Sequence, residues 1–337
     1  MDVELAVRDG NSKVGGGARF LARPALYISI VLGVVLAVYA YKLRTEGIFA
    51  CSAAGYSSDR YLAYCHAKGY GDYEHGAFWF GLEPSTRVFT TNAEVLFLGS
   101  SQLQIALSTA ATANWFSSLA TRYFLMGFGY TGNVVFEGEL LRKYGAHAKV
   151  YVINIERFFD RVESTPVRTV MRDSTARIHY ELKRIWQLVH EPICKGLPLI
   201  CGNRYAIFRS RETGAYHLWG LGEFEHHPVS YEENETIEQV AANDEAAVGR
   251  RFLAGLPVKP ECVILTMVPS GRTKLRAANA LATALGMSLL VPELDGLQTF
   301  DGSHLDQASA ERWSEAFLKD AAPQIRKCLD KVQDPRS

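Results

Sequence analysis

The chain has 337 residues, of which 48% are hydrophobic and 21% charged. These values are typical of a folded protein with one sizeable core, and they exclude a disordered or low-complexity chain. Lysine plus arginine (36) equals aspartate plus glutamate (36). Because proteins that bind nucleic-acid phosphates usually carry a basic excess, we expect no nucleic-acid partner. At roughly 100 to 200 residues per domain, the length permits two domains.

An apolar segment near the N-terminus predicts a transmembrane anchor over residues 24–42. From Pro24 to Tyr41 the sequence contains no charge, and at about 1.5 Å per residue a helix of this length spans roughly 27 Å, nearly a bilayer core. Basic residues are more numerous before the segment than after it. The positive-inside rule therefore places tail 1–23 in the cytoplasm and the chain beyond residue 43 outside. The basic residues are Arg8, Lys13, Arg19 and Arg23 before the segment, and Lys42 and Arg44 after it.

A cleaved secretion signal is the alternative interpretation of this segment. The long polar stretch ahead of the apolar run and the lack of an A-x-A site directly after it favour an uncleaved anchor. We therefore expect a single-pass membrane protein whose larger part is extracytoplasmic.

All six cysteines follow the anchor, on the side of the membrane that is oxidising if this topology holds. Close spacing favours the pairs Cys51 with Cys65 and Cys194 with Cys201. Cys262 and Cys328 can either pair or remain free buried thiols. A zinc site is disfavoured because no C-x-x-C occurs, so we expect no metal.

Short apolar runs beyond residue 90 predict an α/β domain over residues 91–333. The run that ends at Gly99-Ser100-Ser101 is followed by a helical pattern over 102–119, and a second helical pattern over 274–285 precedes the last run. Unalternated apolar strands separated by helices indicate a parallel sheet covered on both faces, a three-layer α/β/α arrangement. The expected strands are 93–99, 150–155, 262–268 and 287–291, and a final helix is expected over 309–319.

Two further segments are predicted. Residues 43–90 are rich in Gly, Tyr and Ser without clear periodicity, and we expect a membrane-proximal segment to which no chemistry is assigned. Residues 157–260 are too long for one crossover and predict an insertion. It contains a helix over 175–189, a loop over 192–203 and an acidic helix over 232–253. The adjacent His226 and His227 permit a metal or catalytic role, but their polar loop favours solvated surface.

The candidate chemistry lies at the two ends of the predicted sheet. Ser101 follows the first strand at the entry to a helix, where backbone N–H groups can stabilise an oxyanion. Asp301 and His304 are three residues apart after the last strand, a spacing that lets a carboxylate orient an imidazole toward a nucleophile. Each signal is weak alone, because a G-S-S turn and a D-x-x-H pair are both common.

The order of these blocks resembles the SGNH (GDSL-type) hydrolase superfamily over residues 91–325. The resemblance implies that Ser101 is the nucleophile, His304 the base and Asp301 its orienting carboxylate. It also implies that the N–H of Gly129, with Gly127 as the alternative, belongs to the oxyanion hole. Asn154 is the candidate for the remaining hydrogen-bond donor of the oxyanion hole. The alternative is that Asn154 is part of the strand expected over 150–155.

Three departures narrow the resemblance. The usual G-D-S is replaced by Gly99-Ser100-Ser101, the third block G-x-N-D is not recognisable, and a single anchor precedes the domain. In these respects the chain resembles the branch that contains alginate O-acetylation proteins and the protein that assists D-alanylation of teichoic acid. This implies an inner-membrane protein with a periplasmic or other extracytoplasmic catalytic domain.

The resemblance implies acyl transfer, with acetyl as the expected group, to a polysaccharide or other envelope polymer. It further implies a membrane-bound O-acyltransferase as partner and no metal or organic cofactor. Ester hydrolysis is the same chemistry with water as the acyl acceptor. The competing class of protein is a non-catalytic subunit of a membrane complex. Four aromatic residues of the insertion are candidates for stacking on sugars, with an insertion core as the alternative: Tyr216, Trp219, Phe224 and Tyr231.

Overall fold

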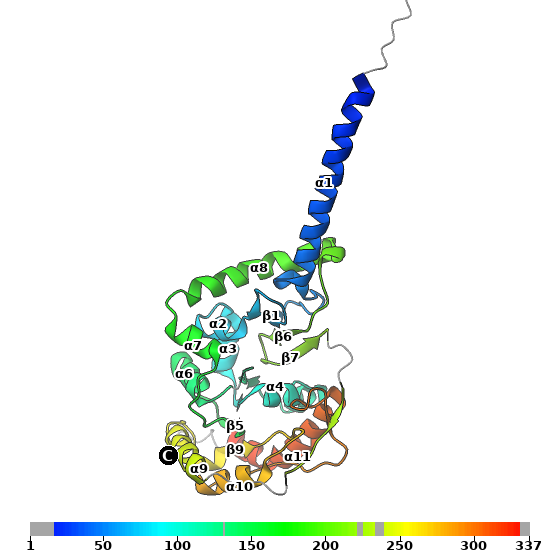
Figure 1. Ribbon diagram of the computed structural model, residues 1–337. Helices are drawn as coiled ribbons and strands as arrows, with labels where there is room; N and C mark the ends of the chain where they lie inside the picture. Colours follow the sequence, from blue (N-terminus) through cyan, green and yellow to red (C-terminus); the bar gives the residue numbers. More distant parts are fainter. Residues whose placement is uncertain (1–16, 131, 221–224, 233–238, 331–337) are drawn as a thin grey trace, which may run out of the picture.

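The structure is a computed structural model that describes residues 17–130, 132–220, 225–232 and 239–330. Helix α1 (Gly17–Thr45) extends away from the folded domain (Figure 1). Its segment Pro24–Thr45 is long and apolar enough to cross a membrane, and none of it is buried. The structure therefore contains a helix at the position expected for the anchor, while most of the predicted cytoplasmic tail lies outside the described residues.

The parallel sheet has the strand order β4-β3-β5-β9. Beyond β9, Leu289 pairs with Leu265 only at an isolated parallel bridge, so the strand expected over 287–291 is reduced to one contact. The reason is chemical: Leu290 donates its N–H to Leu265, but the next ladder donor would be Pro292, which has no N–H. The strands are β3 (Val95–Leu98), β4 (Tyr123–Leu125), β5 (Val150–Asn154) and β9 (Val263–Thr266). The short strand β4 was not expected from the sequence.

Side chains of this sheet alternate between two hydrophobic clusters, so both of its faces are buried. Val95 and Phe97 pack in one cluster, with residues of α4 (Ser101–Leu107), α5 (Ala110–Ser118) and α11 (Gln307–Asp330). Leu96 and Leu98 pack in the other, with residues of α6 (Val134–Tyr144), α9 (Gln239–Ala254) and α10 (Leu275–Ala284). The burial expected for a parallel sheet in an α/β protein is thus observed.

Three expected helices have different bounds. The segment 102–119 is divided into α4 and α5, because the Thr109 side chain accepts the N–H of Thr112 and starts a new helix. The helix expected over 232–253 is described from Gln239 onward as α9, and 233–238 lie outside the described residues. The helix expected over 175–189 continues to Gly196 as α8 (Ala176–Gly196), so Pro192 lies inside a helix rather than in the expected loop.

A second, antiparallel sheet joins the membrane-proximal segment to the insertion. Its order is β2-β1-β6-β7, with β1 (Arg60–Cys65) paired along β6 (Ala206–Ser210). The other strands are β2 (Gly71–Asp72) and β7 (Tyr216–Trp219). Residues 43–90 and 157–260 were expected to be separate segments, but strands from both form one sheet. Its residues Tyr61 and Phe208 belong to the same core as Leu96, so it packs onto the parallel-sheet domain.

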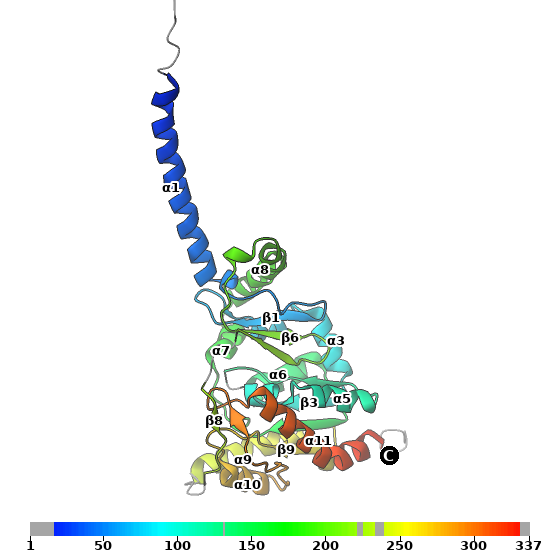
Figure 2. The ribbon, with the colours of Figure 1, turned by 90° about the vertical axis from the view of Figure 1, so that its right-hand side faces the viewer.

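The remaining elements surround these sheets (Figures 1 and 2). They are the helices α2 (Glu74–Trp79), α3 (Pro84–Asn92) and α7 (Thr165–Arg172), the 3₁₀ turns η1 (Ile48–Ala50), η2 (Pro198–Ile200) and η3 (Pro260–Cys262), and the antiparallel strands β8 (His227–Pro228) and β10 (Gln298–Thr299).

Three disulfides connect the cysteines. The two pairs favoured by spacing, Cys51–Cys65 and Cys194–Cys201, are confirmed. The open alternative for Cys262 and Cys328 is resolved as a third bond, which joins η3 to α11.

A buried ion pair connects the two sheets. The Arg209 guanidinium donates to Glu74 at 2.9 Å and to the carbonyl of Leu125 at 2.7 Å. The Tyr216 hydroxyl donates to the same carboxylate at 2.6 Å. Arg209 is completely buried and Glu74 nearly so, and the guanidinium lies over the Phe78 ring. Since buried charges are costly unless they are paired, this contact makes β6, β7, α2 and β4 interdependent.

We expect Arg209→Met to lower the free energy of unfolding by about 3–5 kcal/mol, because it leaves the Glu74 carboxylate buried without a counter-charge. The measurement is denaturant unfolding of the full chain in detergent. Adding Glu74→Gln to this variant should recover part of the loss, whereas Arg142→Ala, at an exposed ion pair, should change little. Equal losses in Arg209→Met and Arg142→Ala would contradict the proposed role of the buried pair.

Candidate active site

Ser101 lies at the carboxyl edge of the parallel sheet, where β3 gives way to α4. Gly99 has φ +148°, and a Cβ there would lie 2.9 Å from Cβ of Asn154, so the tight approach of β3 to β5 requires glycine. Ser100 caps the helix by accepting the N–H of Gln102. Ser101 is then the first residue of α4, so its N–H has no acceptor within the helix. β3 lies between β4 and β5, at the position where open α/β sheets reverse strand order and form sites.

The structure brings Ser101, His304 and Asp301 together in a continuous chain of hydrogen bonds. Ser101 Oγ lies 2.8 Å from His304 Nε2, and His304 Nδ1 lies 2.7 Å from Asp301 Oδ2. The ring of Phe300 stacks on His304 with centroids 5.6 Å apart. With Nδ1 donating to the carboxylate, Nε2 is the acceptor that faces the serine hydroxyl.

Asp301 is held as a carboxylate by its own loop. Burial disfavours the charge, but hydrogen bonds from the His304 ring outweigh it and lower the pKa of Asp301 below its usual value. Its second oxygen accepts the backbone N–H groups of Ser303 at 2.9 Å and His304 at 2.8 Å. The carboxylate is therefore fixed in position and ionised at neutral pH, as required of a group that stabilises an imidazolium.

The backbone N–H groups of Gly129 and of its alternative Gly127 both donate to side chains. The N–H of Gly129 donates to Glu74 at 3.1 Å, and the alternative, Gly127, donates to Gln104 at 3.0 Å. Helix α2 brings the buried Glu74 to Gly129, and α4 brings Gln104 to Gly127. A role of the Gly129 N–H, or of the alternative Gly127 N–H, in an oxyanion hole stays a prediction.

Asn154 lies within strand β5, the alternative left open by the sequence, and it is completely buried. Its Oδ1 accepts the N–H of Val268 at 3.1 Å. Its Nδ2 has no hydrogen-bond partner within the described part of the chain. Asn154 is therefore next to Gly99 and carries a spare donor, but no contact joins it to Ser101.

Several buried polar residues that support the site were missed by the sequence analysis. Glu137 of α6 accepts the N–H of Gly99 at 2.9 Å, and burial raises the pKa of its carboxyl well above its usual value. Gln102 donates to Ser303 at 3.2 Å and ties α4 to the loop of His304. Burial also raises the pKa of Glu156, which follows β5, while the nearby His304 opposes the shift. Single polar residues in otherwise ordinary helices and turns carry no motif that indicates such roles.

A cavity of about 530 Å³ adjoins the loop that carries Asp301 and His304. Phe300 and Leu305, which flank Asp301 and His304, line it, as do Trp219 and His226. Two candidate sugar-stacking residues, Trp219 and Tyr216, line this cavity. Trp219 is 40% exposed, whereas Tyr216 is buried, donates to Glu74 and packs with Ile105 and Phe300. Phe224 lies outside the described residues.

The two histidines of the polar loop are both exposed, and His226 Nδ1 lies 3.2 Å from Asp306. Tyr231, the fourth aromatic candidate, is partly buried and forms an isolated bridge with Thr273.

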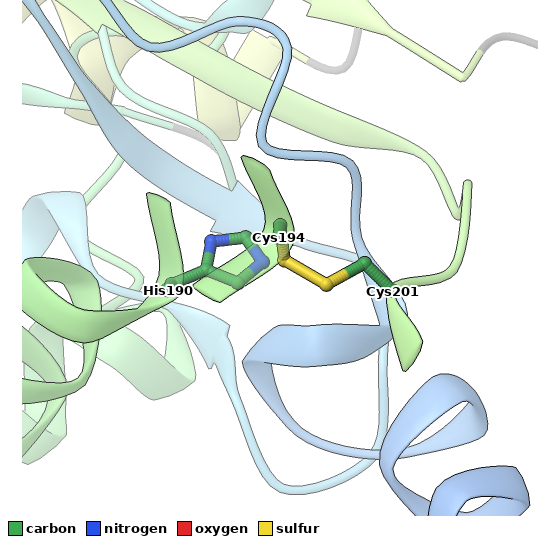
Figure 3. Close-up of side chains that lie close together, drawn as sticks. All are labelled: His190, Cys194 and Cys201. Atoms are coloured by element: carbon green, nitrogen blue, oxygen red, sulfur yellow. A yellow bond between two sulfur atoms is a disulfide. The ribbon is translucent and has the colours of Figure 1, made fainter. Parts of the chain in front are cut away.

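Two groups of potential metal ligands come close together. His190 lies beside Cys194 and Cys201, but Figure 3 shows that the two sulfur atoms are bonded to each other, so neither is a thiolate ligand. Asp72, Glu74 and His75 form the second group. There Arg209 already supplies the positive charge to Glu74, and Asp72 accepts from His75 and Tyr180.

No protein-family model, curated protein or solved structure matches the chain. The geometry of Ser101, His304 and Asp301 is therefore the evidence from which a function is proposed.

The buried Glu137 predicts a pH dependence of stability. Its pKa is raised by folding, so the unfolded chain releases this proton at lower pH than the folded chain does, and stability falls as pH rises above about 4.3. We expect Glu137→Gln to remove this loss. Thermal unfolding midpoints of the two proteins should diverge in favour of the variant as pH rises above about 4.3.

Glu139→Gln, on the same helix and partly exposed, is the matched control and should follow the wild type. Parallel curves for wild type and Glu137→Gln would show that the carboxyl does not titrate in this way.

Proposed function

We propose that the chain is a membrane-anchored SGNH-like serine acyltransferase or esterase, acting on acyl esters, acetyl foremost, of a cell-envelope polysaccharide. The observation that carries the proposal is the hydrogen-bonded series Ser101–His304–Asp301 at the carboxyl edge of a parallel sheet. The strand order, with helices on both faces, supports an SGNH-like three-layer arrangement as part of the same proposal.

The mechanism follows from the groups in place. His304 Nε2 takes the proton of Ser101 as Oγ attacks the carbonyl carbon of an ester. The Ser101 N–H, at the N-terminus of α4, stabilises the negative oxygen. The ester C–O bond then breaks, and the leaving oxygen takes the proton from His304. In the second half, His304 removes a proton from an acceptor hydroxyl or from water, which attacks the acyl-serine and releases Ser101.

The membrane topology is part of the proposal. Helix α1 is the anchor, with the N-terminus cytoplasmic and the domain on the outer side of the inner membrane. The pairing of all six cysteines in disulfides supports an oxidising compartment. The resemblance to the envelope-modifying branch supports a membrane-bound O-acyltransferase as donor partner, and the exposed Trp219 in the adjoining cavity supports a sugar acceptor.

One observation favours the second candidate, a non-catalytic subunit of a membrane complex. The N–H groups of Gly129 and Gly127 are both committed to buried side chains. An oxyanion hole that lacks these donors would stabilise the tetrahedral intermediate poorly, since each donor contributes about 10²–10³ to kcat. The complete Ser–His–Asp series is the argument for catalysis.

The full chain in detergent should react covalently with a serine-directed organophosphonate, because His304 activates Ser101. Ser101→Ala should abolish the labelling and lower turnover on the order of 10⁴-fold. Ser100→Ala is the matched control, since this neighbour caps α4 but makes no contact with His304 in the described structure. Labelling that survives in Ser101→Ala, or that is lost only in Ser100→Ala, would identify another nucleophile.

The fate of the acyl group separates transferase from esterase. A site shaped for a sugar acceptor leaves water poorly placed, so p-nitrophenyl acetate should be hydrolysed slowly and an added oligosaccharide should become acylated. Trp219→Ala should reduce acylated sugar more than it reduces hydrolysis, as measured by mass spectrometry of the products. Fast hydrolysis without sugar product across a glycan panel would favour an esterase, and the lack of any acyl-enzyme would favour the non-catalytic subunit.

A further inference from the structure

Helix α8 presents an apolar face to the outside of the molecule. Ile178, Leu182, Ile185 and Val189 recur at intervals of four, three and four residues, which places them on one side of a helix with 3.6 residues per turn. Trp186 and Leu188 extend this side, and Leu188 is 70% exposed. These six residues are here called the α8 apolar face. A contiguous exposed patch of this kind marks an interaction surface.

The opposite side of α8, which packs on the domain, combines core residues with polar contacts. Ala176, Tyr180 and Cys194 belong to the hydrophobic core. Tyr180 also donates to Asp72 at 2.9 Å, and Gln187 exchanges hydrogen bonds with the backbone of Leu62. A surface helix of a globular protein normally buries its large apolar side chains. In α8 the Ile, Leu and Val side chains between residues 178 and 189 are all exposed, so its outer side is suited to an apolar environment.

The position of α8 identifies that environment. It lies at the end of the domain from which α1 rises, and it runs across the direction of α1 (Figures 1 and 2). The exposed Leu197 and Leu199 continue the apolar surface from α8 toward the foot of α1, where Arg44 donates to the carbonyl of Leu199 at 2.8 Å. The Cys194–Cys201 disulfide holds this connection in place.

The charges of α8 leave it with a basic excess. Its sequence has four Lys or Arg and two Glu residues, a net charge of +2. Arg177, Arg184 and Lys195 are exposed, on the flank between its two sides by the 3.6-residue period. Arg177 pairs with Glu181, and Lys195 with Glu191. Basic residues beside an apolar face that includes Trp are typical of helices that lie in the plane of a bilayer surface.

We infer that the α8 apolar face is embedded in the headgroup and acyl boundary of the same membrane that α1 crosses. The inference rests on the anchoring part of the proposed function, not on its chemistry. The bilayer is preferred to a second copy or a protein partner because the face is continuous with the point where the chain leaves the membrane. Two attachments, α1 and α8, then fix the orientation of the domain on the membrane.

The test uses the full chain reconstituted in vesicles of phosphatidylethanolamine and phosphatidylglycerol, part of which carry bromine on their acyl chains as a quencher of tryptophan fluorescence. Trp186 should be quenched most by bromine near the headgroup end of the chain. Trp186→Phe should remove most of this quenching. Trp115→Phe, in α5 on the parallel-sheet side of the domain, is the matched control and should leave the quenching unchanged.

Each outcome decides the inference. Equal quenching in wild type and Trp186→Phe would overturn it and leave a protein partner as the occupant of the face. Quenching that appears only at high protein-to-lipid ratio would overturn it in favour of a second copy. Flotation of the protein with the vesicles tests the α1 anchor separately. Organophosphonate labelling of Ser101 in the same sample tests the proposed chemistry. A loss of anchoring or of chemistry can therefore be distinguished from a lack of contact between α8 and the membrane.

Discussion

The buried pair of Glu74 and Arg209 is the interaction on which the arrangement of this domain depends. The two residues are 135 positions apart, and neither can remain buried alone without a cost of several kcal/mol. Their network reaches Leu125 at the end of β4, Tyr216 in β7 and the N–H of Gly129. The antiparallel sheet built from two distant segments is thereby locked against the edge of the parallel sheet where Ser101 lies.

This constraint shapes the candidate site. The carboxylate of Glu74 holds the loop after β4 by accepting the N–H of Gly129. The antiparallel sheet contributes Trp219 to the wall of the cavity that Phe300 also lines. The series Ser101–His304–Asp301 comes from the parallel-sheet domain. In the proposed function, the reacting groups and the surface that binds the acceptor would therefore come from different parts of the chain.

The two proposed membrane attachments would fix the orientation of the domain. In our proposals α1 crosses the bilayer and α8, a helix of the insertion, lies on its surface. The inner side of α8 is hydrogen-bonded to β1 and to Asp72 of β2. Asp72 accepts in turn from His75 of α2, the helix that carries Glu74. A continuous set of hydrogen bonds thus runs from the membrane-facing helix through the antiparallel sheet to the loop beside the site. The domain would be presented to its substrate in one orientation.

The sequence by itself determined the features that rest on local pattern. These are the apolar helix, the three main parallel strands and the two closely spaced disulfides. The sequence also singled out Ser101, Asp301 and His304, whose side chains lie together in the structure, while their catalytic roles stay a prediction. Only the tertiary structure decided the rest. The pairing of β1 with β6, the Cys262–Cys328 bond and the Glu74–Arg209 network join residues far apart in the chain, and no periodicity records such contacts. The hydrogen bond from the Gly129 N–H to Glu74 belongs to the same group, because the partner of a backbone N–H depends on which side chain folding brings to it.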